Sequence, residues 1–298
     1  MPPVQNLPEE PMIAQERHQL TGTITQSDIL TSQRPALRRY RSWRRFHHGP
    51  RSEDKPLFRN LSRYGDCVLV AGCQRSGTTI LTRIIAGSRG FQRLRLTHDD
   101  ELDAALILAG HVDVPHDRRY CFQTTYLNER YSEYGMMGPG QRLVWVLRNP
   151  YSVVYSMVHN WKRFALNELY ETCGVLRAET KRQHRTSMPW PFGPSRVEKA
   201  CLSYSAKSSQ ILSIRELLRP EQLLVVDYDE MVQSSDAWLP QIFAFIGEPY
   251  EPAYSSSVHA GSVRKADKVS GRVRKLIEEQ CSPTYRRCFT LVSRGARS

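Results

Sequence analysis

One short segment limits the fold of this chain more than any other feature: an apolar run that leads directly into a glycine-containing turn and then a helix. Residues 67–71 (Cys-Val-Leu-Val-Ala) are flanked by polar and glycine residues, as in a strand that is covered on both faces of a parallel sheet. The turn 72–79 follows, and apolar residues then recur at helical spacing over 80–85, before Gly87. A strand, a tight turn and a helix in this order predict an α/β fold.

Two further apolar runs extend this prediction. Residues 142–147 and 223–226 have the length and composition of buried strands, and both are followed by polar residues. Helical periodicity is found over 151–167 and 197–218, so that strands alternate with helices. We therefore expect one central parallel sheet flanked by helices, with ligands at the carboxyl ends of the strands.

The turn itself has the composition of a phosphate-binding loop. Gly72 and Gly77 match the spacing G-x-x-x-x-G, but Thr78 stands where a Walker loop has its lysine. Backbone N–H groups and the positive end of the following helix can still hold an anion. The donor groups expected to bind it come from one stretch of the turn: Arg75, Ser76, Gly77, Thr78 and Thr79. At this point the phosphate compound stays open.

A second group of possible anion ligands follows the predicted strand 142–147. Arg148 comes directly after the strand, and Ser156 lies eight residues later on a helix that begins near Pro150. Taken singly, each residue has an ordinary structural explanation: an arginine pairs with a carboxylate, and a serine packs on a helix. A cation at the end of a neighbouring strand nevertheless favours a shared site with the turn.

The two halves together resemble the family of sulfotransferases that use 3'-phosphoadenosine-5'-phosphosulfate (PAPS). The likeness rests on residues 73–79 (Cys-Gln-Arg-Ser-Gly-Thr-Thr), residues 146–150 (Val-Leu-Arg-Asn-Pro) and Ser156, and it spans roughly 66–280. It implies a sulfotransferase architecture related to P-loop nucleoside triphosphatases, with 3',5'-ADP as the nucleotide product. It also implies that the turn holds the 5'-phosphosulfate and that Arg148 and Ser156 hold the 3'-phosphate.

Two later segments add to the resemblance. Residues 227–232 (Asp-Tyr-Asp-Glu-Met-Val) are similar to a family segment whose tyrosine lies near the adenine, which implies this position for Tyr228. Residues 262–268 resemble the basic loop that closes over the nucleotide, and Lys265 is its expected ligand.

The general base is expected just beyond the first helix, where four titratable residues stand in a row: His98, Asp99, Asp100 and Glu101. Family members that act on protein tyrosines or glycans have a glutamate in this region, so the resemblance favours Glu101. The lysine and histidine of the small-molecule members are replaced by Gln123 and Thr125. The remaining alternative is that these carboxylates only cap a helix over 100–109.

The resemblance also assigns a role to the turn in catalysis. Arg75 and the N–H groups of the turn suit the stabilisation of charge on the moving sulfuryl group. Positive side chains can take the place of the magnesium ion of nucleotide kinases, so no metal is expected.

The net charge of +12 fits a polyanionic partner but does not identify one. Residues 1–58, with many arginines and aromatic residues over 34–51, are expected to form a disordered or loosely docked basic arm, and 59–298 the sulfotransferase domain. The seven cysteines form no C-x-x-C pair, and neither an export signal nor a membrane span is visible. These features favour the cytoplasm.

The acceptor is expected to be a hydroxyl compound, with a carbohydrate, a lipid or a small molecule favoured, and its contacts are expected within 157–220. Two alternatives remain open from the sequence alone. One is a nucleotide-dependent phosphotransferase, which the missing loop lysine disfavours. The other is a non-catalytic protein that binds nucleic acid through the basic arm.

Overall fold

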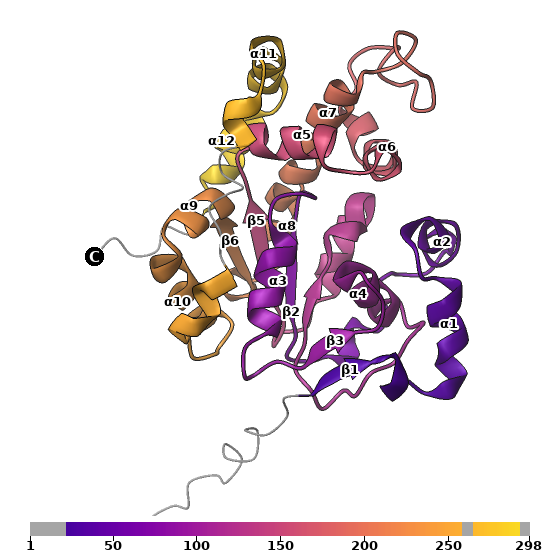
Figure 1. Cartoon of the computed structure of the whole chain (residues 1–298), viewed down its shortest axis with the longest axis vertical. Helices are drawn as coiled ribbons and strands as arrows, with labels where there is room; N and C mark the ends of the chain where they lie inside the picture. The colour runs from indigo at the N-terminus through magenta and orange to yellow at the C-terminus, as the bar shows by residue number, and fades with distance from the viewer. Residues whose placement is uncertain (1–21, 258–264, 293–298) are drawn as a thin grey trace, which may run out of the picture.

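The computed structural model describes residues 22–257 and 265–292 (Figure 1). Its centre is a four-stranded sheet in which every neighbouring pair is parallel, in the order β4-β2-β5-β6. The strands span Cys121–Gln123 (β4), Val68–Gly72 (β2), Arg142–Leu147 (β5) and Leu223–Asp227 (β6). The predicted α/β fold with a central parallel sheet flanked by helices is confirmed.

Helices surround this sheet, and a second parallel pair of strands lies apart from it. The pair consists of β1 (Thr23–Thr25) and β3 (Arg93–Arg95). The helices are α1 (Arg34–Arg39), α2 (Trp43–His48), α3 (Thr78–Ala86), α4 (Asp100–Leu108), α5 (Pro150–His159), α6 (Arg163–Thr172), α7 (Arg196–Ser209), α8 (Ile211–Leu217), α9 (Tyr228–Gln233), α10 (Ser235–Phe245), α11 (Gly271–Gln280) and α12 (Ser282–Phe289).

The central strand β2 shows why this sequence forms this sheet. All five of its residues are buried, as expected for a strand with neighbours on both edges and helices on both faces. Its last residue, Gly72, pairs with Val146 of β5 and has a φ of 148°. A Cβ atom at this position would collide with the Val146 carbonyl oxygen, so only glycine lets the chain leave the sheet here.

Two hydrophobic clusters lie on either side of the carboxyl ends of the strands. The larger one covers the sheet and includes Trp145, which is fully buried. The smaller one joins α5, α6, α7 and α11 through residues such as Met157 and Leu169. Figure 1 shows these helices beyond the upper ends of β2 and β5, so the turn after β2 lies between the two hydrophobic clusters.

The two long helices predicted from periodicity are each divided in two. The segment 151–167 breaks after His159, because Asn160 ends α5 and Lys162 has the extended backbone of a helix N-cap. Trp161 lies in this break. The segment 197–218 is divided at Gln210, between the end of α7 and the start of α8; the Gln210 side-chain amide donates to the Asn128 carbonyl oxygen at 2.8 Å.

Over residues 22–58 the structure differs from the predicted disordered or loosely docked arm; residues 1–21 lie outside the described residues. Leu37 of α1 and Phe46 of α2 are buried in the main core, as are Leu57 and Phe58. Arg51 forms an ion pair of 2.6 Å with Glu129. Both α1 and α2 have six residues and contribute one buried side chain each. Helices this short show no helical periodicity in the sequence.

None of the helices formed by the described residues combines the length and the apolar character needed to cross a bilayer.

Candidate active site

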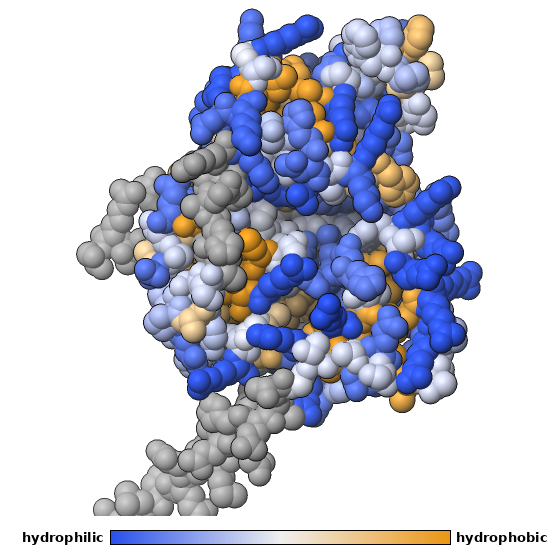
Figure 2. Space-filling view, in the orientation of Figure 1, coloured by the Kyte–Doolittle hydropathy of each residue, from blue (hydrophilic) through white to orange (hydrophobic). Residues whose placement is uncertain are grey.

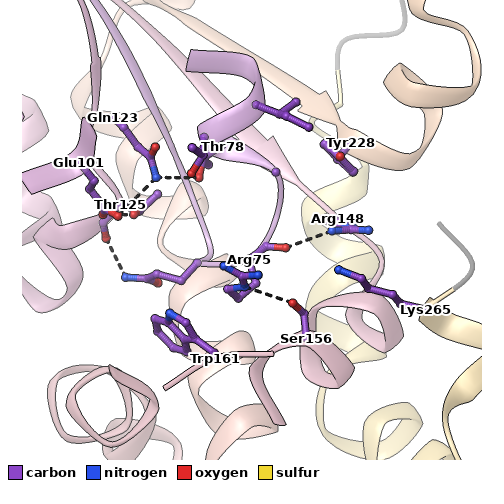
Figure 3. Close-up of a pocket in the computed structure, with 14 residues that line it drawn as sticks. Arg75, Thr78, Glu101, Gln123, Thr125, Arg148, Ser156, Trp161, Tyr228 and Lys265 are labelled. Carbon is purple, nitrogen blue, oxygen red and sulfur yellow. Dashed lines mark hydrogen bonds between the residues drawn. The ribbon is translucent and has the colours of Figure 1, made fainter. Parts of the chain in front are cut away.

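A cavity of about 280 Å³ opens at the carboxyl ends of β2 and β5 (Figure 3). We call it the donor-side cavity. It is lined by residues of the turn and of α3, by residues of β4, α4 and α5, and by residues near the end of the chain: Gln74, Arg75, Gly77, Thr78, Thr79, Ile80, Glu101, Gln123, Thr125, Arg148, Ser156, Trp161, Tyr228 and Lys265. Apart from Ser76, which is buried and not part of the lining, the predicted donor-binding residues therefore meet in one place.

The turn has the backbone geometry of an anion-binding loop. Gly77 is the N-cap of α3, with a φ of 97°, and Arg75 has a φ of 72°. A Cβ atom at Gly77 would also collide with the Tyr228 ring. The Ser76 hydroxyl is buried and has no hydrogen-bond partner among the described residues. The first N–H groups of α3 are thus placed to donate hydrogen bonds to a bound anion.

Three cationic side chains converge on the cavity from distant parts of the chain: Arg75, Arg148 and Lys265 (Figure 3). Burial lowers the pKa of Arg75, and the charge of Arg148 lowers it further. Burial also lowers the pKa of Lys265, and Arg148 and Arg75 add to this effect. Such mutual repulsion costs free energy in the absence of a ligand and is relieved when a multiply charged anion binds.

Arg148 is held in this position on several sides. Its guanidinium lies 4.5 Å from the centroid of the Tyr228 ring, and its Nε lies 3.4 Å from a carboxylate oxygen of Asp229. Its Nη1 donates to the Arg75 carbonyl oxygen at 3.2 Å, and its own carbonyl oxygen accepts from the Tyr204 hydroxyl at 2.8 Å. The side chain is fixed before any ligand arrives.

Glu101 brings a carboxylate to the edge of the same cavity. It lies in the first turn of α4 and accepts hydrogen bonds from the Thr125 hydroxyl and, at 3.3 Å, from the Gln123 amide. The Gln123 amide also donates to the Thr78 hydroxyl at 3.2 Å, so it links the carboxylate to the turn. Burial raises the pKa of Glu101 to about 8, and the nearby Asp99 charge adds to the rise.

The other candidates for the base have different surroundings, and the donor-side cavity does not include them in its lining. Asp99 caps α4 by accepting from the backbone N–H groups of Glu101 and Leu102. Asp100 forms an ion pair of 2.7 Å with Arg83. His98 is exposed. The predicted capping role holds for this cluster, but the cap is Asp99.

A second cavity of about 460 Å³ adjoins the first, and we call it the acceptor-side cavity. Gln74, Arg75, Thr79, Glu101, Gln123 and Trp161 line both cavities. Its outer wall contains Glu168, which lies within the predicted acceptor region, and three side chains that were not expected from the sequence: Trp43, Tyr126 and Asn128. No sequence pattern marks these three, because they come from α2 and from the segment after β4.

Trp43 is fixed against the site although it precedes the sheet in sequence. Its indole N–H donates to a carboxylate oxygen of Asp99 at 2.7 Å, and its ring lies 5.9 Å from the ring of Tyr126. On the same side, a His47 ring nitrogen lies 3.3 Å from a Glu168 carboxylate oxygen. Burial raises the pKa of Glu168, whereas the charge of His47 opposes the rise.

Within the predicted acceptor region, Trp161 lies between the two cavities, whereas Trp190 is 70% exposed and lines a separate surface hollow. Of the expected closing loop 262–268, residues 262–264 lie outside the described residues, and Lys265 reaches the donor-side cavity.

Several solved structures are similar to this chain. The sulfotransferase domain of the curacin biosynthetic pathway is 15% identical, with a TM-score of 0.46, over 75% of this chain and 95% of that one. The sulfotransferase domain of a Synechococcus olefin synthase is 11% identical, with a TM-score of 0.48, over 72% and 93%. A mouse sulfotransferase complexed with PAP is 15% identical, with a TM-score of 0.45, over 80% and 93%.

No curated protein matches the sequence. The model of the sulfotransferase domain family, in contrast, matches residues 65–279, which include the turn, Arg148, Ser156, Tyr228 and Lys265. This range covers most of the chain and contains the whole central sheet. The chain therefore belongs to the sulfotransferase domain family and is a PAPS-dependent sulfotransferase.

Proposed function

We propose that this enzyme transfers the sulfuryl group of PAPS to a hydroxyl in the acceptor-side cavity, with Glu101 as general base. The observation that carries this proposal is the position of the Glu101 carboxylate, which lines both cavities next to the turn. A base at this boundary can reach a hydroxyl on one side while the turn holds the donor on the other.

Each predicted donor residue has a role in this proposal. Backbone N–H groups of the turn, together with Ser76, Thr78 and Thr79, hold the 5'-phosphosulfate, while Arg148 and Ser156 hold the 3'-phosphate. Tyr228 lies beside the adenine, and Lys265 covers the nucleotide. The convergence of positive charge and the buried Ser76 hydroxyl without a partner among the described residues support this arrangement.

The reaction then depends on three groups of this chain. Glu101 takes the proton of the acceptor hydroxyl as the new oxygen–sulfur bond forms. Arg75 and the N–H groups at the start of α3 stabilise the negative charge that grows on the departing phosphate side. Gln123, which donates to both Glu101 and Thr78, holds the carboxylate in a fixed position relative to the turn.

For the acceptor we propose a hydroxyl compound, with carbohydrates favoured. Trp43 and Trp161 give the cavity flat apolar faces, and Gln74, Asn128 and the carboxylates give it polar partners. Such mixed walls suit a ring that carries several hydroxyl groups. We also propose a cytoplasmic location, which the seven buried free cysteines support.

The test is the thermal stability of the chain with 3',5'-ADP, with ADP and with ATP. A ligand that binds only the folded chain raises the melting temperature. We expect a rise with 3',5'-ADP that exceeds the rise with ADP or ATP, and its loss in Arg148→Ala. An equal rise with all three nucleotides would contradict the assignment of a 3'-phosphate site.

A further inference from the structure

A third hollow, of about 670 Å³, continues the acceptor-side cavity away from the donor, and we call it the outer groove. Arg83, His98 and Asp100 line both spaces, so the two hollows adjoin at these residues. The groove runs along α3 and β3 and is lined further by Gln92, Arg93, Arg95 and Thr97. Together the spaces exceed what a single sugar ring or small alcohol fills.

The outer groove is strongly basic. Arg93 and Arg95 occupy alternate positions of β3, so both side chains leave the same face of the strand, and both are exposed. Leu94 between them faces the main core. Arg83 also lines the groove, where it is paired with Asp100, the one acidic residue of the lining.

Each carboxylate of the acceptor-side cavity has a hydrogen-bond or ion-pair partner. Asp99 accepts from the Trp43 indole and from two backbone N–H groups. Glu168 lies against His47, and Glu101 accepts from Thr125 and Gln123. The positive residues Arg83 and Lys162 also line this space. The positive groups that attract an approaching anion are concentrated in the outer groove, at Arg93 and Arg95.

We propose that the acceptor is an acidic oligosaccharide, whose reacting sugar lies between Trp43 and Trp161 while a neighbouring acidic sugar lies on Arg93 and Arg95. This inference rests on the proposed function and names the substrate class of the same site. The walls favour an oligosaccharide over an anionic lipid, because hydrogen-bonding groups occur in both hollows, from Asn128 to Gln92. Figure 2 shows that hydrophilic side chains also dominate the face over α1 and α2 beside it.

The test compares sugars that differ only in charge. Tetragalacturonic acid and a hyaluronan tetrasaccharide are each paired with their carboxyl-reduced counterparts, and phosphatidylinositol micelles provide a lipid arm. Binding is measured by calorimetry with 3',5'-ADP present, and transfer is measured with labelled PAPS. We expect at least one acidic sugar to bind and react about tenfold better than its carboxyl-reduced form.

The matched variants are Arg93→Glu with Arg95→Glu, and Lys181→Glu with Arg215→Glu. Both change the charge equally at exposed positions, but the second pair is absent from the lining of all three cavities. In the groove variant, the KM for the acidic sugar should rise at least tenfold, and the KM for the reduced sugar should change less than twofold. The control variant should change neither.

Three results would overturn the inference: no binding of either acidic sugar, equal use of the acidic and reduced forms, or transfer to phosphatidylinositol alone. The stabilisation by 3',5'-ADP is recorded in every arm. If it persists while the acidic sugars fail, the acceptor class is wrong and the donor site stands. If it is missing in the unaltered enzyme, the proposed function itself is wrong.

Discussion

The Arg75 Nε donates to the Ser156 hydroxyl at 3.1 Å, although 81 positions separate the two residues in the sequence. This bond joins the turn after β2 to the helix after β5 and thereby joins the two predicted halves of the donor site. Each half alone has an ordinary structural explanation, whereas a bond between them places both around one cavity.

Arg148→Ala should weaken the binding of 3',5'-ADP by about 2 kcal/mol, or roughly thirtyfold in Kd, because a charged hydrogen-bond donor to the 3'-phosphate is lost. Calorimetry measures the change. Arg215→Ala, on the exposed face of α8, serves as the control and should leave the affinity unchanged. Equal affinities in Arg148→Ala and the unaltered enzyme would remove Arg148 from the donor site.

Glu101→Gln should lower kcat by about 10²-fold or more, because the amide keeps the shape of the carboxylate but cannot take the proton. The affinity for 3',5'-ADP should stay within twofold. Asp100→Asn is the matched control: it loses an ion pair with Arg83 but should keep nearly full activity. If Asp100→Asn were the slower variant, the base would have to be reassigned.

The rate should depend on pH through the same carboxylate. The pKa of Glu101 is about 8, so the free enzyme carries a protonated, inactive base at pH 6. We expect kcat/KM to rise about tenfold per pH unit below pH 8 and to level off above it. A profile that is flat between pH 6 and pH 9 would be incompatible with Glu101 as the base.

The raised pKa also affects stability, with a defined sign. Between the ordinary value of 4.5 and the folded value of about 8, the folded chain holds a proton that the unfolded chain releases. The contribution of this group to the free energy of unfolding is therefore greatest below pH 4.5, and it decreases as the pH rises towards 8. Glu101→Gln cannot release this proton and so lacks this pH-dependent destabilisation. The difference between its melting temperature and that of the unaltered chain should therefore shift in favour of the variant as the pH rises from 5 to 9.

Gly77→Ala should abolish the stabilisation by 3',5'-ADP and lower the free energy of unfolding by about 1–3 kcal/mol. A side chain there requires a backbone with φ of 97° and pushes against the Tyr228 ring. Gly65→Ala is the control, because a Cβ atom at Gly65 meets no atom within 4 Å. Chemical denaturation with and without nucleotide distinguishes the two effects.

Trp43→Ala should raise the KM for the acceptor about tenfold while leaving 3',5'-ADP affinity unchanged, because the indole lines only the acceptor-side cavity. Trp190→Ala, which removes an indole that is 70% exposed, should have no effect on either. If the Trp43 variant lost nucleotide affinity instead, the two cavities would not be separable in function.

Most of the residues predicted for the donor half line one cavity, and short motifs in the sequence contain them. The turn 72–79 is continuous in the chain, and Arg148 follows a strand whose neighbours are set by the parallel sheet. For the acceptor half, the sequence indicates Glu101 and the region 157–220 but gives no signal for Trp43. Trp43, Glu101 and Glu168 come from three helices, and only tertiary packing brings them to one space.

The same reasoning explains the differences in secondary structure. The break at Trp161 is set by the packing of α5 and α6 on a small second core, whereas the helical periodicity continues through it. The three-residue strand β4 is too short for its alternation to be visible. For residues 34–58, the arginines dominate the composition, yet Phe46, Leu57 and Phe58 determine the packing.

The position of Trp43 has a consequence for how such an enzyme diversifies. This residue precedes the span 65–279 that the family model matches, yet it forms a wall of the proposed acceptor site. Substitutions in α2 can therefore alter which molecule is sulfated without touching any residue that holds the nucleotide. One wall of the acceptor-side cavity is thus inherited outside the family span, whereas Glu101 and Trp161, which line both cavities, are inherited within it.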